Sequence, residues 1–165
     1  MNMPRGTTNK VLRRVRQLSQ LSSQYITLAQ IARTLGLSPT QAKYAATTYL
    51  QNLFVKACWG NQCVHVTKAF WENAVREFPA LLAAVRKRVF KAADLYDALC
   101  GSRYRKWTRK GYYTTPTPPL VILVSLAKTF GAREMEGYPG VFYITTTPHG
   151  GGEVKHLKAL CKMYL

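Results

Sequence analysis

The sequence between Thr27 and Val66 reads TLAQIARTLGLSPTQAKYAATTYLQNLFVKACWGNQCVHV and holds signals for two helices and a β-hairpin. Thr27 can cap a first helix, because its hydroxyl can accept from the third helical amide while Gln30 reaches back to the Thr27 amide. Gly36 can end this helix, since glycine is the residue most often found just beyond a helix C-terminus. The pattern predicts one helix that ends at the glycine turn.

A second helix is predicted directly after the turn. Ser38 can cap the exposed amides, and Pro39 fits the first helical position, where its missing donor is no loss. No glycine or proline follows before Phe54, so the helix is predicted to extend to about that residue. Apolar residues recur on one side and form the predicted buried stripe: Ala42, Ala45, Tyr49, Leu50 and Leu53.

This stretch resembles the helix-turn-helix superfamily of DNA-binding domains. The superfamily pattern is matched by small and apolar residues, namely Ile31, Ala32, Leu35, Gly36, Leu37, Ala42 and Ala45. The resemblance covers residues 27–66 and implies that the second helix lies in the major groove of DNA. The side chains implied to read DNA are the exposed ones on that helix: Ser38, Thr40, Gln41, Lys43, Tyr44 and Thr47.

Two of these side chains have a defined recognition chemistry. Gln41 can make a bidentate contact with adenine, whereas Lys43 and the hydroxyl groups can bind phosphate or base edges. Any amphipathic helix also has a polar face that is simply solvated, so the residue types alone do not establish a reading surface.

A two-residue Gly60-Asn61 turn fixes the pairing of the hairpin that follows. The predicted cross-strand pairs are Trp59 with Gln62, Cys58 with Cys63, Ala57 with Val64, Lys56 with His65 and Val55 with Val66. Alternation then gives an apolar face of Val55, Ala57, Trp59, Val64 and Val66. The open face holds Lys56, Cys58, Cys63 and His65. Two helices and a hairpin in this order resemble a winged helix-turn-helix, which implies backbone contacts by Lys56 and His65.

The pair Cys58 and Cys63 allows three interpretations. As a non-hydrogen-bonded pair, the two Cα atoms would lie about 4.5 Å apart, within the range that a disulfide tolerates. We predict the Cys58–Cys63 bridge, although two ordinary thiols fit about equally well. A zinc ion could use both cysteines and His65, but a structural zinc site needs four ligands and no fourth one is nearby in the sequence. No metal and no cofactor is therefore predicted.

The start of the chain bears on its location. Residues 1–10 contain no apolar block, so no signal peptide is predicted and the protein is expected inside the cell, in the cytoplasm or nucleoid. Intracellular disulfides persist mainly in hyperthermophiles. A Cys58–Cys63 bridge would therefore point to a hyperthermophile, or to its virus or plasmid.

The charge balance indicates a polyanionic partner. Lys and Arg number 24 against 7 Asp and Glu, which gives +17 on 165 residues, and 47% of the residues are apolar. A surface of one sign repels itself unless a polyanion balances it, and nucleic acid is the commonest such partner. No apolar run is long enough to span a membrane, and the basic residues are spread along the chain, so no membrane partner is predicted.

The fold class predicted from these signals is mainly α with small β-hairpins (α+β), arranged as a tandem winged helix-turn-helix. An amphipathic helix over residues 10–21, with Arg13, Arg14 and Arg16 beside its apolar side, would complete a first domain of residues 1–67. A connecting helix is predicted over residues 68–78, because Pro79 can open a new helix. A second winged-helix-like domain is predicted over residues 79–147.

The second domain repeats the order of parts without repeating the sequence. Helices are predicted over residues 79–88, 92–99 and 118–130, with Thr117 as the cap of the third helix and Gly131 as its stop. Strands are predicted over residues 132–136 and 141–146. The third helix is apolar almost all round, so it is predicted to be buried and unable to read a groove.

A basic loop over residues 101–117 is a further candidate for nucleic-acid binding. It carries Arg103, Arg105, Lys106, Trp107, Arg109 and Lys110, interleaved with Tyr104, Tyr112 and Tyr113. Cations bind phosphates and aromatic rings stack on bases, so the mixture suits single-stranded or irregular nucleic acid as well as duplex DNA. The alternative is a solvated loop whose rings anchor it to the core.

Residues 148–165 combine a Gly150-Gly151-Gly152 hinge with an amphipathic helix. Its apolar stripe is Val154, Leu157, Leu160 and Tyr164. This stripe is expected to dock onto the second domain, and the alternative is pairing with a partner chain, for instance in a homodimer. The sequence does not decide whether Cys100 pairs with Cys161.

Catalysis is not predicted. Glu134 and Glu136 could begin a nuclease metal site, but no local motif adds a third ligand. The sequence therefore favours a non-enzymatic duplex-DNA-binding protein, such as a transcription regulator, a replication initiator or a chromatin-type protein. The alternative is a structural RNA-binding protein, for instance a ribosome-associated one.

Overall fold

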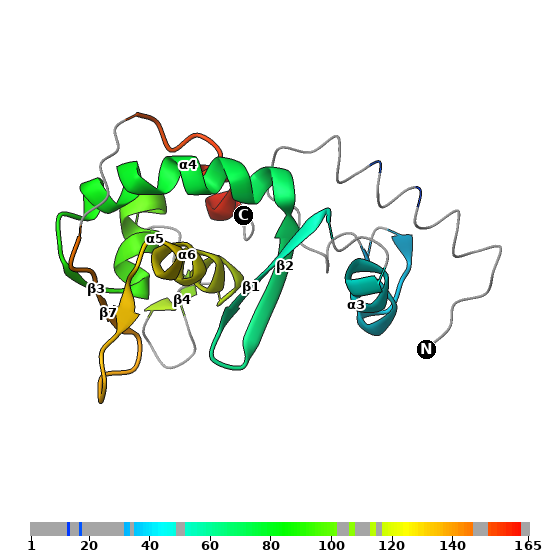
Figure 1. Ribbon diagram of the computed structural model, residues 1–165, viewed down its shortest axis with the longest axis horizontal. Helices are drawn as coiled ribbons and strands as arrows, with labels where there is room; N and C mark the ends of the chain where they lie inside the picture. Colours follow the sequence, from blue (N-terminus) through cyan, green and yellow to red (C-terminus); the bar gives the residue numbers. More distant parts are fainter. Residues whose placement is uncertain are drawn as a thin grey trace.

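The computed structural model describes Arg13, Gln17, Ala32, Arg33 and residues 35–48, 52–101, 106–107, 113–114, 117–146 and 152–162. Helices and small antiparallel sheets make up these residues, which confirms the α+β class. Figure 1 shows helix α3 at one end of the longest axis and strands β3 and β7 at the other. The β1–β2 hairpin lies between them.

A glycine turn links the first helix to α3. The Leu37 amide donates to the Ala32 carbonyl at 2.8 Å, and the Gly36 amide donates to the Arg33 carbonyl at 3.4 Å. Gly36 has a φ of 70°, which is the left-handed conformation of a Schellman C-cap. The predicted end of the first helix at Gly36 is confirmed. Its predicted start at Thr27 lies outside the described residues.

Helix α3 spans Pro39–Thr48 and buries Ala42 and Ala45, as predicted. The prediction that it extends to about Phe54 is wrong. The chain is in a turn by residues 52–53, and Phe54 already pairs with Thr67 in the hairpin. Strand pairing at Phe54 therefore replaces the last helical turn that the absence of glycine and proline had suggested.

The hairpin has the predicted register. Strand β1 (Phe54–Trp59) pairs with β2 (Gln62–Thr67), and every predicted pair from Val55↔Val66 to Trp59↔Gln62 is present. On the predicted apolar face, Ala57 and Val66 are buried in the main core. The two-residue turn was sufficient to fix the register, because it leaves only one way to pair the flanking residues.

Helix α4 spans Lys68–Val85 without interruption. The prediction that one helix ends at Phe78 and another opens at Pro79 is therefore wrong. Phe78, Pro79 and Leu82 all lie on the buried face, so the apolar stripe continues through the proline. An interior proline costs about 3 kcal/mol. Burial of this stripe offsets that cost.

Further helices and strands follow α4 along the chain, and we call them, together with α4, the C-terminal unit. Their order is β3 (Val89–Lys91), α5 (Ala92–Cys100), α6 (Thr117–Thr129), β6 (Arg133–Glu134) and β7 (Val141–Tyr143). The three strands form one antiparallel sheet in the order β3-β7-β6. The predicted end of the helix over residues 79–88 is also wrong, because α4 stops at Val85 and residues 89–91 form β3. The predicted strands are present but shorter.

Two further elements complete the described chain. Within the basic loop, β4 (Lys106–Trp107) pairs with β5 (Tyr113–Thr114). The C-terminal segment contains a 3₁₀ helix, η2 (Leu157–Lys162), in place of the predicted α-helix. Its Leu157 and Leu160 are fully buried in the main core, so the apolar stripe docks onto the same chain, as expected.

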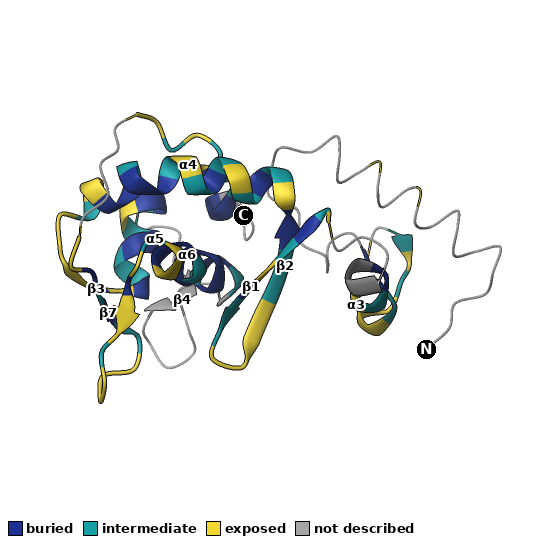
Figure 2. Ribbon diagram, in the orientation of Figure 1, coloured by how far each residue is buried: buried dark blue, intermediate teal, exposed yellow. Residues whose placement is uncertain are grey.

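Helix α6 is the centre of the main core. Residues 121–124, Leu126 and Ala127 are fully buried, which confirms the predicted burial of this helix. Figure 2 shows the buried sides of α4, α5 and α6 turned toward one another. The core also includes Ala57 and Val66 from the hairpin.

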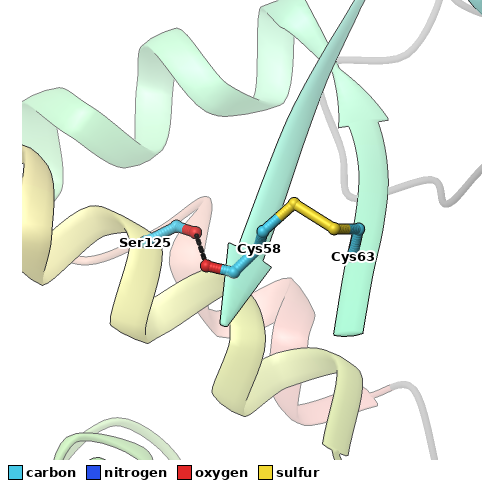
Figure 3. Close-up of a disulfide and its surroundings, with 3 residues drawn as sticks. All are labelled: Cys58, Cys63 and Ser125. Carbon is cyan, nitrogen blue, oxygen red and sulfur yellow. Dashed lines mark hydrogen bonds between the residues drawn. A yellow bond between two sulfur atoms is a disulfide. The ribbon is translucent and has the colours of Figure 1, made fainter. Parts of the chain in front are cut away.

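Polar and aromatic contacts attach the hairpin to the same core. The Ser125 hydroxyl on α6 donates to the Cys58 carbonyl at 3.2 Å (Figure 3). The Trp59 and Phe142 ring centroids are 6.0 Å apart. The hairpin, which was assigned to residues 1–67, therefore shares its core with the elements that follow it. The buried residues Ala32, Ala42, Ala45 and Phe54 lie outside that core.

Two disulfides and one carboxylate fix the remaining segments. Cys58 and Cys63 are joined across the hairpin with Cα atoms 4.1 Å apart, and Cys100 is joined to Cys161 with Cα atoms 5.5 Å apart. The Glu77 carboxylate on α4 accepts from the backbone amides of His156 at 2.8 Å and Leu157 at 3.0 Å. Glu77 therefore caps the amide end of η2.

We expect Thr67→Ala to destabilise the fold by about 1 kcal/mol, because the buried Thr67 hydroxyl accepts from the Phe70 amide and caps α4. Chemical denaturation of the purified protein measures this change. Thr67→Ser retains the capping oxygen and serves as the control. Equal losses for the serine and alanine variants would show that the lost methyl group matters and the cap does not.

The two disulfides should contribute unequally to stability. They close loops with sequence separations of 5 and 61, so chain entropy predicts about 2 kcal/mol for Cys58–Cys63 and about 4 kcal/mol for Cys100–Cys161. Denaturation of the paired serine variants of each bridge measures the difference. Mass spectrometry of protein alkylated before reduction provides the check. Four free thiols in gently isolated protein would contradict both bridges.

Candidate nucleic-acid interface

Helix α3 presents a polar face opposite its buried alanines. Thr40 and Lys43 are exposed and have the three-residue spacing that brings residues onto one side of a helix. Ala42 and Ala45 occupy the other side and are buried. Figure 2 shows the start of α3 in the colour of exposed residues. Of the residues expected to read DNA, Ser38, Thr40 and Lys43 are exposed, whereas Gln41 and Tyr44 are half-buried.

Ser38 and Gln41 form a capping box at the start of α3. The Ser38 hydroxyl accepts from the Gln41 amide at 3.1 Å, and Gln41 Oε1 accepts from the Ser38 amide at 3.0 Å. Each side chain thus satisfies an amide that the first helical turn leaves without a partner. A bidentate contact between Gln41 and adenine needs both ends of the side-chain amide. That contact would require Gln41 to release the Ser38 amide.

Lysines from α3 and from the hairpin converge on one histidine. Lys56 pairs with His65 across the strands, on the face directed away from the main core. Burial lowers the pKa of His65 below its usual 6.5, and the charges of Lys56 and then Lys43 lower it further. Lys43 on α3 therefore lies close enough to act on the imidazole. We call Lys43, Lys56 and His65 the α3–hairpin cluster.

The disulfide supports the hairpin side of this cluster. Cys58 and Cys63 form the next pair on the same face of the strands as Lys56 and His65. A covalent link beside this pair prevents the strands from slipping past one another, so Lys56 and His65 stay opposite. With both thiols in the bridge, Cys58 and Cys63 are not free to bind a metal ion.

The remaining predicted binding residues are described only in part. Arg13 is exposed and helical. Lys106 and Trp107 lie in β4, opposite Thr114 and Tyr113, and Thr47 lies in α3. The others lie outside the described residues: Arg14, Arg16, Arg103, Arg105, Arg109 and Lys110.

Two basic features of the folded chain were not predicted from the sequence. The approach of Lys43 to His65 depends on how α3 lies beside the hairpin, and no spacing in the sequence encodes that angle. The run Arg86-Lys87-Arg88 is visible in the sequence and is exposed after α4. Its high density of charge was the signal that could have identified it.

Of the two acidic residues considered for a nuclease site, Glu134 has another contact and Glu136 is exposed. Glu134 Oε2 accepts from the Gly140 amide at 2.7 Å and closes the β6–β7 turn. Among the described residues, no three His, Cys, Asp or Glu side chains are grouped so that they could hold a metal ion. Within the same part of the chain, no helix is both long and apolar enough to span a membrane.

Comparisons with protein-family models, with curated proteins and with solved structures find no match to this chain.

The lowered pKa of His65 makes a testable prediction about stability. The unfolded chain binds this proton more readily than the folded chain, so the contribution of His65 is complete above about pH 6.5 and decreases as the pH falls toward the folded pKa. We expect His65→Gln to flatten the loss of stability between about pH 7 and about pH 5. Denaturation across this range measures it.

Lys155→Gln is the control for that experiment, because Lys155 is exposed and does not contribute to the shift at His65. It should leave the pH profile unchanged. Superimposable profiles for the parent protein and His65→Gln would contradict the assignment of the pH dependence to the cluster.

Proposed function

We propose that this protein binds duplex DNA without catalysing a reaction. In this proposal α3 enters the major groove, and Lys56 and His65 contact the flanking phosphates. The observation that carries it is the α3–hairpin cluster, where exposed lysines from a helix and a hairpin both act on the pKa of His65. Positive charge on both a helix and a hairpin matches a groove and its flanking phosphates better than charge on one helix face does.

The shape and charge of α3 support this proposal. An α-helix with its side chains is about 10–12 Å across, and the major groove is about 12 Å wide. Thr40 and Lys43 lie in the first turns of α3, and base contacts in this class of domain come from the start of the recognition helix. The sequence has no acidic residue before Glu72, so nothing acidic in α3 or the hairpin repels phosphate.

We also propose that the C-terminal unit is a second winged helix in which the third helix is structural. The order α4, β3, α5, α6, β6, β7 supports this, because it has three helices followed by a hairpin that joins one earlier strand. The hairpin β1–β2 covers α6, and the core encloses most of its side chains. In this proposal only α3 reads a groove.

A structural RNA-binding role remains the second candidate. The observation that favours it is the β4–β5 pairing inside the basic loop, which sets Trp107 opposite Tyr113. Two aromatic residues at paired positions, in a loop rich in Arg and Lys, are suited to stacking on unpaired bases. Competition between duplex DNA and folded RNA separates the two functions.

The biological setting belongs to the proposal as well. Transcription regulation, replication initiation and chromatin-type packaging all need a non-catalytic duplex binder of this kind. Two disulfides in a protein proposed to act on DNA inside a cell favour a hyperthermophilic host, or its virus or plasmid.

Removing two charges from the α3–hairpin cluster tests the proposed interface. Lys43→Gln with Lys56→Gln should reduce the log–log salt slope of duplex binding by about 2, since each phosphate contact contributes about 0.9. Fluorescence anisotropy across a salt series measures the slope. The matched control is Lys155→Gln with Lys158→Gln, which removes the same charge from exposed positions at and beside η2.

An equal loss of slope in the control variant would mean that net charge alone drives binding, and it would contradict the interface. Stronger binding to folded RNA than to duplex DNA, unaffected by the Lys43 and Lys56 changes, would favour the second candidate.

A further inference from the structure

A second basic surface lies at the far end of the molecule from α3. Five exposed cations surround the β3-β7-β6 sheet: Arg86, Lys87, Arg88, Lys91 and Arg133. We call these five residues the sheet-end surface. Figure 1 shows β3 and β7 at the opposite end of the longest axis from α3, with the hairpin and α6 between.

The register of the sheet explains why Lys91 and Arg133 face outward. Phe90 pairs with Phe142, and both are buried on the core side. Neighbouring rows point the other way, so Val89, Tyr143 and Arg133 form one cross-strand row on the outer face. Val89 is 52% exposed. Lys91 lies on the same outer face, two residues along β3 from Val89.

The nearby carboxylates offset only part of the positive charge of this surface. Asp94 accepts from the backbone amide of Lys91 at 2.9 Å, and Glu134 accepts from the amide of Gly140. Among the described residues, none of the five cations forms an ion pair. Glu136, which is exposed in the turn after β6, is the remaining acid near the sheet. The net charge of the surface is therefore positive.

Stabilisation of the C-terminal end of α4 explains only part of the sheet-end surface. Arg86 occupies the left-handed C-cap position of α4, with a φ of 56°, and a cation at a helix C-terminus is favoured by the helix dipole. Lys91 and Arg133 lie on strands β3 and β6, outside the last turn of α4. The dipole effect falls off within that turn, so it does not account for these two cations.

We propose that the sheet-end surface is a second binding site for duplex phosphates, so that one chain bridges two segments of duplex. This inference rests on the proposed function, because the first segment is the one held by α3. Five cations without carboxylate partners match a regular array of phosphates. The two surfaces are separated by the packed core, so a straight duplex bound at α3 leaves the sheet-end surface available for another.

Binding stoichiometry and bridging together test the proposal. Duplexes of about 15 base pairs, roughly one and a half turns of B-DNA, are titrated into the full chain, and analytical ultracentrifugation counts duplexes and chains per complex. In parallel, an immobilised duplex is used to capture a second, labelled duplex in the presence of protein. We expect two duplexes per chain and efficient capture for the parent protein.

Three double variants assign each site. Lys87→Glu with Arg88→Glu leaves the Arg86 cap in place and should reduce the stoichiometry to one and capture by at least about tenfold, with affinity at the remaining site within about twofold. Lys43→Glu with Lys56→Glu should abolish binding at the α3 site, and with it the capture of a second duplex. Lys155→Glu with Lys158→Glu should retain both. Circular dichroism and thermal unfolding confirm that each variant is folded.

The outcomes distinguish the two proposals. One duplex per chain in the parent protein, or capture that survives the Lys87 and Arg88 changes, overturns the second site and leaves the α3 site intact. Capture by a protein dimer in which each chain holds one duplex would also overturn the second site. Tight binding that survives the Lys43 and Lys56 changes but is lost with Lys87 and Arg88 overturns the α3 proposal. Absence of duplex binding overturns both.

Discussion

Packing of the β1–β2 hairpin against α6 is the interaction on which the rest of the structure depends. The apolar face of the hairpin contributes Ala57 and Val66 to the main core, and Ser125 on α6 donates to the Cys58 carbonyl. This contact covers α6, so that helix is structural. It also directs the other face of the hairpin, with Lys56 and His65, away from the core and toward α3.

The distribution of charge follows from this arrangement. A chain with 24 basic and 7 acidic residues has few carboxylates available for surface ion pairs. Several of those carboxylates hold backbone amides instead: Glu77 at η2, Asp94 at α5 and Glu134 at the β6–β7 turn. These acids fix the backbone at three places, and among the described residues the five cations of the sheet-end surface form no ion pair.

Local rules predicted the elements well and their packing poorly. The register of the hairpin followed from the Gly60-Asn61 turn, because a two-residue turn permits one pairing only. Pro79 misled the prediction, since the continuous buried face of α4 outweighs the local preference of proline for a helix start. The approach of Lys43 to His65 depends on a crossing angle that tertiary contacts set. For the same reason, the sequence did not reveal that the hairpin joins the core of the elements after it.

The Cys100–Cys161 bridge makes residues 100–161 a covalent ring. The basic loop 101–117, rich in Arg and Lys, lies within this ring and contains many sites for a trypsin-like protease. A single cut there opens the ring but releases no fragment, because the bridge still joins the two pieces. A chain cut within this loop would thus remain one molecule until the bridge is reduced.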